Sequence, residues 1–260
     1  ISPSGINCSS SIVPEVELRN YGNDPLTSVT INYQTTGGVQ QFAWTGSLTT
    51  GQTTNVTLPA VATAGGNVTL TVYTSNPNGQ IDDDESNDES MVGLNVYTAA
   101  ATLPFVEDFE NNIISTGEWS LVNPDADITW ELATVGGITP GSTAAKIDFF
   151  NYSTAAQRDG LISPRISLAG YNTAEMSFDH AYRRYNQNAA DSLVIYVSTD
   201  CGQSWTSVFA AAENGTGSLA TQTTNTASFT PAIADDWCFA GGVGATCFTV
   251  DLTPFIGQEI

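Results

Sequence analysis

Basic residues are scarce in this chain. Only 6 of its 260 residues are Lys or Arg, against 27 Asp or Glu, which gives a formal net charge of −21 at pH 7. A chain of this charge repels phosphate backbones and anionic lipid surfaces, so nucleic-acid binding and attachment to such membranes are excluded. No apolar run approaches the roughly 18 residues of a membrane-spanning helix. The excess carboxylates therefore serve solubility in an extracellular medium or bind cations.

Histidine is nearly absent from this chain, and cysteine motifs that bind metals are missing. His180 is the single histidine and the four cysteines form no CxxC pair, which excludes a zinc finger. No GxSxG or HExxH motif occurs, and strand alternation would point His180 to the opposite face from Asp179. We therefore expect no catalysis in this segment. A paired-carboxylate hydrolase, for which any two acids could suffice, stays as the remote alternative.

The four cysteines indicate an oxidising compartment. Cys238 and Cys247 flank the turn-forming run FAGGVGAT, and we expect them to form a disulfide that staples a hairpin or loop. For Cys8 and Cys201, free and paired states both stay open. The chain opens with ISPSG and shows no signal peptide, so we expect a mature fragment cut from a longer secreted protein.

What the chain does contain favours strands. Hydrophobic residues make up 41% and charged residues only 13%, while β-branched and small polar residues are abundant. In LTSVTINYQ, Val29, Ile31 and Tyr33 alternate, and Phe42 and Trp44 alternate in the next segment. Turn signals about every ten residues are typical of a β-sandwich. The acidic run from Ile81 to Ser90 is interpreted as a solvated hairpin loop.

The second half also predicts short strands. TAAATLP, residues 98–104, is small, neutral and ends in proline, so we place a linker there between domains at 1–97 and 105–260. DSLVIYVS carries Leu193, Ile195 and Val197 on one face and Val194 and Tyr196 on the other, which predicts a strand buried on both sides. No window shows helical periodicity, so the predicted fold class is all-β.

A candidate cation site lies early in the second half. Asn123, Asp125, Asp127 and Thr129 alternate through NPDADIT, and on an extended segment such oxygens point the same way and can converge on one cation. Two carboxylates about 4 Å apart repel by roughly 4 kcal/mol at an effective dielectric near 20. One hard cation, with calcium preferred over magnesium, would remove this cost. The alternative, ordinary turn and cap carboxylates, stays open.

Particular motifs in the second half carry a family resemblance. LPFVEDFEN, NPDADITW, LISPRISLAG, SFDHAYRRYNQNAADSLVIYVSTDCGQSW and TVDLTPFIGQEI follow one another in an order that resembles the choice-of-anchor J or cleaved-adhesin domain, a MAM-like jelly roll. SPSGINC, PEVELRNYG, LTSVTINYQ, WTGSL and NPNGQID resemble CARDB-type immunoglobulin-like modules. The resemblance implies an Ig-like β-sandwich followed by a jelly roll. Family members continue past a GQxI segment, so the jelly roll is expected to lack its last strands.

The same resemblance implies a calcium ligand set and a parent protein. It adds Asp108, Glu110, Ser142, the backbone carbonyl of Ala144, and Asp159 to the ligands, divided between two calcium ions. It also places this pair of modules in the C-terminal regions of secreted pappalysin-like metalloproteases and gingipain adhesins exported by type IX secretion. The segment would then be a non-catalytic, calcium-stabilised accessory or adhesion region at the cell surface, partnered by other domains of the same polypeptide.

A second candidate surface is AYRRYNQN. Arg183 and Arg184 are two of the few basic residues, and Tyr182 and Tyr185 flank them. Aromatic rings beside arginine and asparagine are typical of glycan or peptide recognition. The alternative function is therefore a carbohydrate- or protein-binding module acting as an adhesin, and the alternative structural interpretation is an exposed strand end. The tryptophans are expected in the core rather than in a ligand platform.

Overall fold

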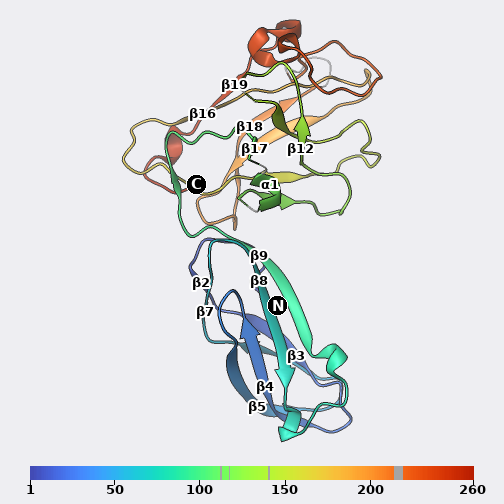
Figure 1. The fold of residues 1–260 in the computed structure, drawn as a ribbon, viewed down its shortest axis with the longest axis vertical. Helices are drawn as coiled ribbons and strands as arrows, with labels where there is room; N and C mark the ends of the chain where they lie inside the picture. Colours follow the sequence, from blue (N-terminus) through green and yellow to red (C-terminus); the bar gives the residue numbers. More distant parts are fainter. Residues whose placement is uncertain (112, 117, 140, 214–218) are drawn as a thin grey trace. The chain divides into compact units, whose positions relative to one another are not determined.

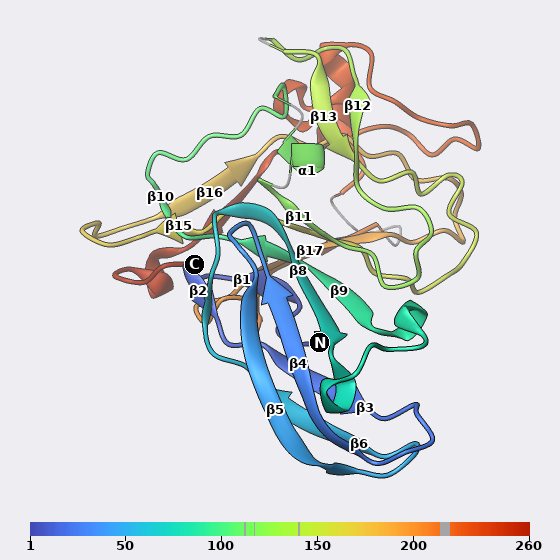
Figure 2. The same ribbon diagram turned by 60° about the horizontal axis from the view of Figure 1, so that its bottom comes forward.

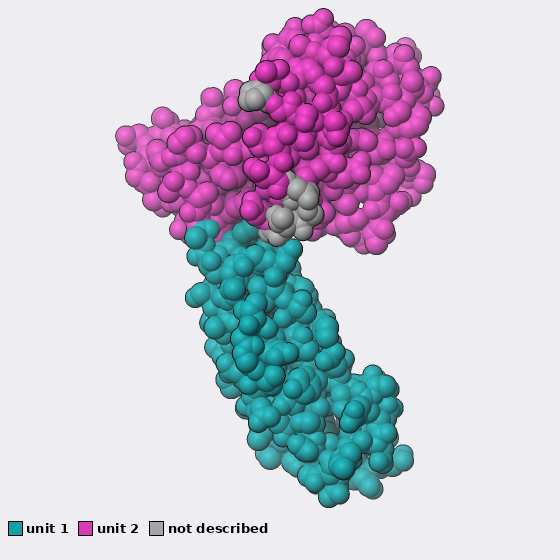
Figure 3. All heavy atoms as spheres, viewed as in Figure 1, with its two compact units in different colours: residues 1–99 teal, residues 100–260 magenta. Residues whose placement is uncertain are grey.

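The chain forms two compact units, Ile1–Ala99 and Ala100–Ile260 (Figure 3). The computed structural model describes residues 1–111, 113–116, 118–139, 141–213 and 219–260. The division falls inside the segment 98–104 where the sequence predicts a linker. Two residues of that segment, Ala101 and Thr102, form strand β10 (Ala101–Thr102) and pair in parallel with β15 (Ile166–Ser167), so they belong to the second unit.

Both units are built from strands, which confirms the all-β prediction (Figures 1 and 2). The one α-helix among the described residues, α1 (Ile113–Thr116), has only four residues. Short 3₁₀ turns complete the regular structure: η1 (Pro77–Gly79), η2 (Glu85–Asn87), η3 (Ala234–Asp236), η4 (Cys238–Ala240), η5 (Gly242–Gly244) and η6 (Thr253–Phe255).

Unit 1 contains a five-stranded sheet in the order β1-β9-β8-β4-β5 and two further strand pairs, β2–β7 and β3–β6. The β1–β9 pair is parallel and the others are antiparallel. The strands are β1 (Gly5–Asn7), β2 (Ser11–Ile12), β3 (Glu15–Arg19), β4 (Leu26–Gln34), β5 (Gln40–Leu48), β6 (Thr53–Thr57), β7 (Val61–Ala62), β8 (Gly66–Ser75) and β9 (Glu89–Val96).

The core of unit 1 lies between the five-stranded sheet and the β3–β6 pair. Val29, Ile31 and Tyr33 of β4 are 4%, 1% and 1% exposed, which confirms the period-two prediction for this strand. Val16 of β3 and Val56 of β6 belong to the same core. Full burial of each such side chain stabilises the fold by about 1.5–3 kcal/mol, so the two layers are held together as a sandwich.

The acidic run connects β8 to β9, which pair antiparallel, so its interpretation as a hairpin connection is confirmed. Within it, Asp84 caps η2 by accepting from the Ser86 backbone N–H at 3.1 Å. Asp83 is exposed and makes no hydrogen bond or ion pair with the described residues. The solvated loop keeps these carboxylates away from the core of unit 1.

Unit 2 consists of short paired strands joined by long loops. The pairs are β10–β15, β11–β14, β12–β13, β16–β19 and β17–β18, all antiparallel except the first. The remaining bounds are β11 (Ser120–Val122), β12 (Glu131–Thr134), β13 (Thr143–Lys146), β14 (Gly160–Ile162), β16 (Glu175–Phe178), β17 (Ser192–Val197), β18 (Thr206–Ala212) and β19 (Phe248–Asp251).

A core of aliphatic and aromatic side chains fills unit 2. Leu168 is fully buried and packs with Val250 of β19 and Val197 of β17. The predicted burial of β17 on both faces is wrong for Tyr196, which is 45% exposed. Val194 on the same face is half-buried, so this face is covered at Val194 and solvent-exposed at Tyr196.

Candidate metal centre

Tyr152 lies between two of the predicted calcium ligands. Its hydroxyl is 3.0 Å from Asp125 Oδ2 and 2.9 Å from Asp159 Oδ2, yet it has one proton to donate. Burial, followed by hydrogen bonding to Asp159 and Asp125 and by their charges, raises the pKa of Tyr152 well above its usual range. The hydroxyl therefore stays protonated and serves one carboxylate at a time, which leaves the other without a compensating donor.

The NPDADIT segment forms a tight turn rather than the expected extended segment. Asp125 Oδ1 accepts from the Asp127 N–H at 3.2 Å, and Asn123 Nδ2 donates to the Asp127 carbonyl at 2.9 Å. Ala126 adopts a left-handed φ of 58° between them. Asn and Asp side chains compete with strand pairing by bonding to nearby backbone groups, which explains why alternation failed as a guide here.

Three buried oxygens at this turn lack a hydrogen-bond partner among the described residues. They are Asn123 Oδ1, Thr129 Oγ1 and Asp159 Oδ1. The Trp130 indole N–H donates to the Asp159 carbonyl at 3.1 Å, so the segment that carries Thr129 is held next to the one that carries Asp159. Each buried unsatisfied polar group costs about 1–3 kcal/mol. Amide, hydroxyl and carboxylate oxygens are the donor types that calcium takes, so these residues fit that ion.

A second group of predicted ligands surrounds Glu110. Its Oε1 accepts from the backbone N–H groups of Ser142 and Thr143, both at 2.7 Å, and Asp108 Oδ1 accepts from the Glu110 N–H at 3.1 Å. Gly141 allows this approach, since a Cβ there would lie 2.8 Å from Glu110 Oε1. Backbone N–H groups therefore compensate the Glu110 carboxylate. The group around Glu110 has less need of a cation than the turn at Asn123–Asp127.

The predicted ligands therefore fall into separate sets. Hydrogen bonds join Asn123, Asp125, Asp127 and Asp159 through Tyr152, and they join Asp108, Glu110 and Ser142 through backbone amides. Ala144 lies in β13 opposite Ala133 and is linked to neither set by a described hydrogen bond. Tyr152 was missed in the sequence analysis, because nothing in the sequence around a single tyrosine in a polar loop indicates which side chains its hydroxyl contacts.

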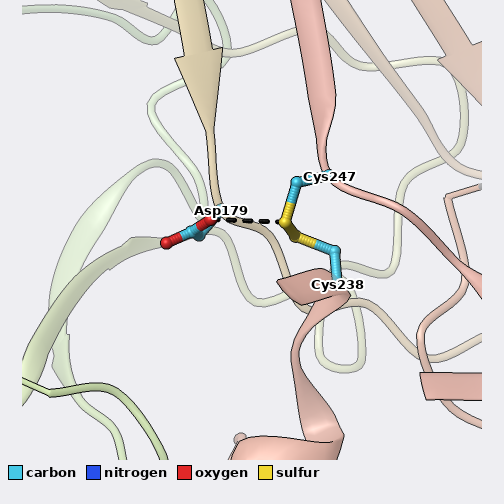
Figure 4. Close-up of side chains that lie close together, drawn as sticks. All are labelled: Asp179, Cys238 and Cys247. Carbon is cyan, nitrogen blue, oxygen red and sulfur yellow. Dashed lines mark hydrogen bonds between the residues drawn. A yellow bond between two sulfur atoms is a disulfide. The ribbon is translucent and has the colours of Figure 1, made fainter. Parts of the chain in front are cut away.

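One further group of possible metal ligands involves Asp179, Cys238 and Cys247 (Figure 4). Cys238 and Cys247 form the predicted disulfide, with an S–S distance of 2.01 Å. Asp179 Oδ1 lies 3.3 Å from Cys247 Sγ, and the oxidised sulfur has no hydrogen to donate across this contact. Metal binding requires thiolates, so the disulfide removes this group from consideration as a metal centre.

His180 is a core residue. It is 9% exposed while the neighbouring Asp179 is exposed, and both residues lie just beyond the end of β16 rather than on the strand that the sequence suggested. Its ring stacks on Phe248 at 4.7 Å, and Nε2 lies 3.2 Å from the Leu219 carbonyl. Burial lowers the pKa of His180. A neutral, stacked imidazole fits a packing role.

The segment Tyr182–Tyr185 uses its arginines internally. Arg183 Nη2 donates to the carbonyls of Ala227 and Ser228, both at 2.8 Å. Arg184 is 8% exposed and donates to the carbonyls of Ala189 and Gln187 at 2.7 and 2.5 Å. Both guanidinium groups therefore fasten loops of unit 2.

The aromatic rings of that segment have neighbours from another loop. The Tyr182 hydroxyl donates to Asp191 at 2.5 Å, and Phe149 contacts its ring edge-on at 6.4 Å. Tyr185, 43% exposed, meets Phe150, 48% exposed, at 5.9 Å. The solvent-facing part of this predicted ligand site is thus aromatic. Among the tryptophans, Trp237 is 5% exposed as expected, whereas Trp205 is 43% exposed.

The remaining observations concern compartment and relatives. Cys8 and Cys201 are also disulfide-bonded, so every cysteine is oxidised, which is consistent with an extracellular protein. Among the described residues, no helix has the length and apolar character needed to cross a membrane. Comparison with family models, with curated proteins and with solved structures finds no match to this chain.

Proposed function

We propose that this chain is a non-catalytic, calcium-stabilised accessory or adhesion region of a secreted or cell-surface multidomain protein. The observation that carries the proposal is the turn at Asn123–Asp127, where two carboxylates share one hydroxyl proton and three buried oxygens lack partners. Residues Asn123, Asp125, Thr129 and Asp159 would hold the ion. Bound calcium supplies the missing positive charge and the missing partner for these oxygens.

The ion would act by joining loops. Asp159 directly precedes β14, whereas Asn123 directly follows β11 and Asp125 lies two residues further on, and these two strands pair with one another. Tyr152 lies in the same β13–β14 loop as Asp159 and contacts both Asp125 and Asp159. A cation held by the four proposed ligands would tie this loop to the loop between β11 and β12. This supports a structural role in an extracellular medium, where calcium is plentiful and all cysteines are oxidised.

Calcium-dependent unfolding of the full chain tests the proposal. We expect calcium to raise the unfolding temperature and a chelator to lower it, with magnesium at the same ionic strength much less effective. Asp159→Asn should weaken calcium binding at least about tenfold. Asp83→Asn is the matched control, because it removes one carboxylate from the most acidic loop of unit 1. Equal stability with calcium and with chelator would sink the proposal.

A second candidate function is ligand binding at the aromatic cluster of Phe149, Phe150 and Tyr185. Its support is the exposure of all three rings, 37%, 48% and 43%, together with the contact between Phe150 and Tyr185 at 5.9 Å. Exposed rings of this kind stack on sugars or anchor protein partners. A glycan or host-protein array that shows saturable binding, lost in the Phe150→Ala Tyr185→Ala double variant, would favour this function.

A further inference from the structure

The open edge of the unit 1 sheet is formed by β5. This strand pairs with β4 on one side and ends the strand order on the other. In the part of the chain that the structure describes, residues 40–47 make no other backbone hydrogen bonds. The side chains of Gln40 and Gln41 reach back to Tyr33 and Asn32 of β4, so they do not cover the edge. One row of backbone donors and acceptors is therefore available to another strand.

Most of the usual protections of an edge strand are missing from β5. Natural edge strands are kept short or carry charges, proline or bulges. The opposite edge, β1, has only three residues, whereas β5 has nine. No proline lies in β5, and no Asp, Glu, Lys or Arg occurs anywhere from Pro25 to Ile81. One bulge opposite Thr27 affects Gly46 and Ser47 alone, and the register is regular from Gln40 to Thr45.

Charge decides which partner fits this edge. With a net charge of −21, most surfaces of two copies would bring carboxylates against carboxylates. The edge of β5 and the strands around it, β4, β6 and β8, are free of charge, so here two copies can approach without that repulsion. Ala43 and Thr45 are exposed, while Phe42 and Trp44 pack partly against the core.

We infer that β5 is a self-association edge, which pairs antiparallel with β5 of a second copy of this chain about a two-fold axis. A register centred on Ala43 places Phe42 opposite the partner's Trp44 and Gln41 opposite the partner's Thr45. Aromatic cross-strand pairs stabilise antiparallel strands. A two-fold axis repeats each pair, so this register makes the aromatic contact between Phe42 and Trp44 twice and joins the two sheets into one.

Sedimentation of the full chain tests the inference. We expect a monomer–dimer equilibrium in the micromolar range, with the dimer at twice the 27.4 kDa chain mass. Ala43→Lys sets two lysines opposite each other on the axis and should weaken dimerisation about fivefold. Ala43→Glu should do the same. An equimolar mixture of the two variants should recover association as a heterodimer, because the facing charges are then opposite.

The control is Thr69→Lys, which adds the same charge to an exposed position of β8, where β8 pairs with β9 and lies away from β5 in the strand order. This variant should dimerise like the unchanged chain. Thermal unfolding of each variant checks that it is folded. A chain that stays monomeric at all concentrations overturns the inference, as does a dimer that Ala43→Lys leaves intact. A dimer strengthened by salt supports it, since screening removes the general repulsion without touching the uncharged edge.

Discussion

Tyr152 is the residue on which the candidate metal centre depends. Replacing it with Phe removes the hydroxyl between Asp125 and Asp159 and keeps most of the ring packing. A hydrogen bond to a charged carboxylate is stronger than one between neutral groups. We expect Tyr152→Phe to lower the free energy of unfolding in chelator, because this bond is lost. The loss should be smaller in calcium, because the ion then compensates both carboxylates.

Urea unfolding with and without calcium measures this difference. Tyr196→Phe is the matched control, since Tyr196 is 45% exposed and its loss of a hydroxyl touches neither carboxylate. An equal loss in calcium and in chelator would show that the Tyr152 hydroxyl acts independently of any ion.

Asp200 gives a pH dependence with a definite sign. Its carboxylate accepts from the Ser204 hydroxyl at 2.5 Å, from the Ser204 N–H at 2.8 Å and from the Ser198 hydroxyl at 2.8 Å. These bonds, those of Ser204 first, lower the pKa of Asp200 from 3.8 to about 2. The folded state therefore holds the proton less tightly than the unfolded state. The stabilisation is fully present above pH 4 and is lost as the pH falls toward 2.

The variant Asp200→Asn isolates this contribution from the other acids. It should be less stable than the unchanged chain at neutral pH, and the gap should narrow between about pH 4 and pH 2. Acid unfolding curves of the two proteins, taken as a difference, provide the measurement. A gap that is constant over this range would mean that the Asp200 carboxylate is not selectively stabilised in the folded chain.

At the residue scale, the sequence predicted which residues gather at the candidate metal centre better than it predicted how the backbone places them. Asn123, Asp125 and Asp127 lie at one turn, but Ala126 reverses the backbone there, which no alternation rule anticipates. The contacts of Tyr152 span 27 residues to Asp125, so they depend on how the β13–β14 loop folds back. Ala144 shows the limit of carrying a ligand over by resemblance, since its position in a paired strand leaves it outside both linked sets.

At the scale of elements, predictability follows the pairing of strands. β4 is flanked by β5 and β8 and lies over the core, so its alternating pattern is preserved in the burial of Val29, Ile31 and Tyr33. In unit 2, the described strands are short and loops carry much of the packing. Arg183 and Arg184 illustrate the consequence. Their sequence context indicated a ligand site. In the structure, their guanidinium groups donate hydrogen bonds to backbone carbonyls of loops, and no sequence pattern marks those carbonyls.

The Cys238–Cys247 disulfide contributes to the stability of the segment that contains the η3–η5 turns. It closes a loop with a sequence separation of nine and joins η4 to the start of β19. Closing a loop of this size restricts the unfolded chain, which stabilises the fold by about 2–3 kcal/mol. The Cys238→Ser Cys247→Ser variant should lose this amount in urea unfolding. An unchanged midpoint would mean that the η3–η5 turns hold this segment without the staple.

For the whole molecule, charge imbalance is the dominant electrostatic feature. The chain has 27 acidic residues and 6 basic ones, yet the described residues contain only three ion pairs, Lys146 with Glu131 and Asp148, and Arg165 with Glu259. Such partly exposed pairs contribute about 0–1 kcal/mol each. Repulsion among the remaining carboxylates therefore outweighs attraction, and it opposes the compact state.

Salt should consequently stabilise this protein. Raising NaCl from low to half-molar concentration screens the repulsion, so the urea midpoint should increase, and the increase should be larger in chelator than in calcium. The increase is expected to be smaller in calcium because a bound divalent cation already neutralises part of the negative charge at the candidate metal centre. Urea is the suitable denaturant, since guanidinium would itself screen the charges. A midpoint that falls with salt would mean that a few ion pairs, rather than the acidic surplus, set the electrostatic balance of the fold.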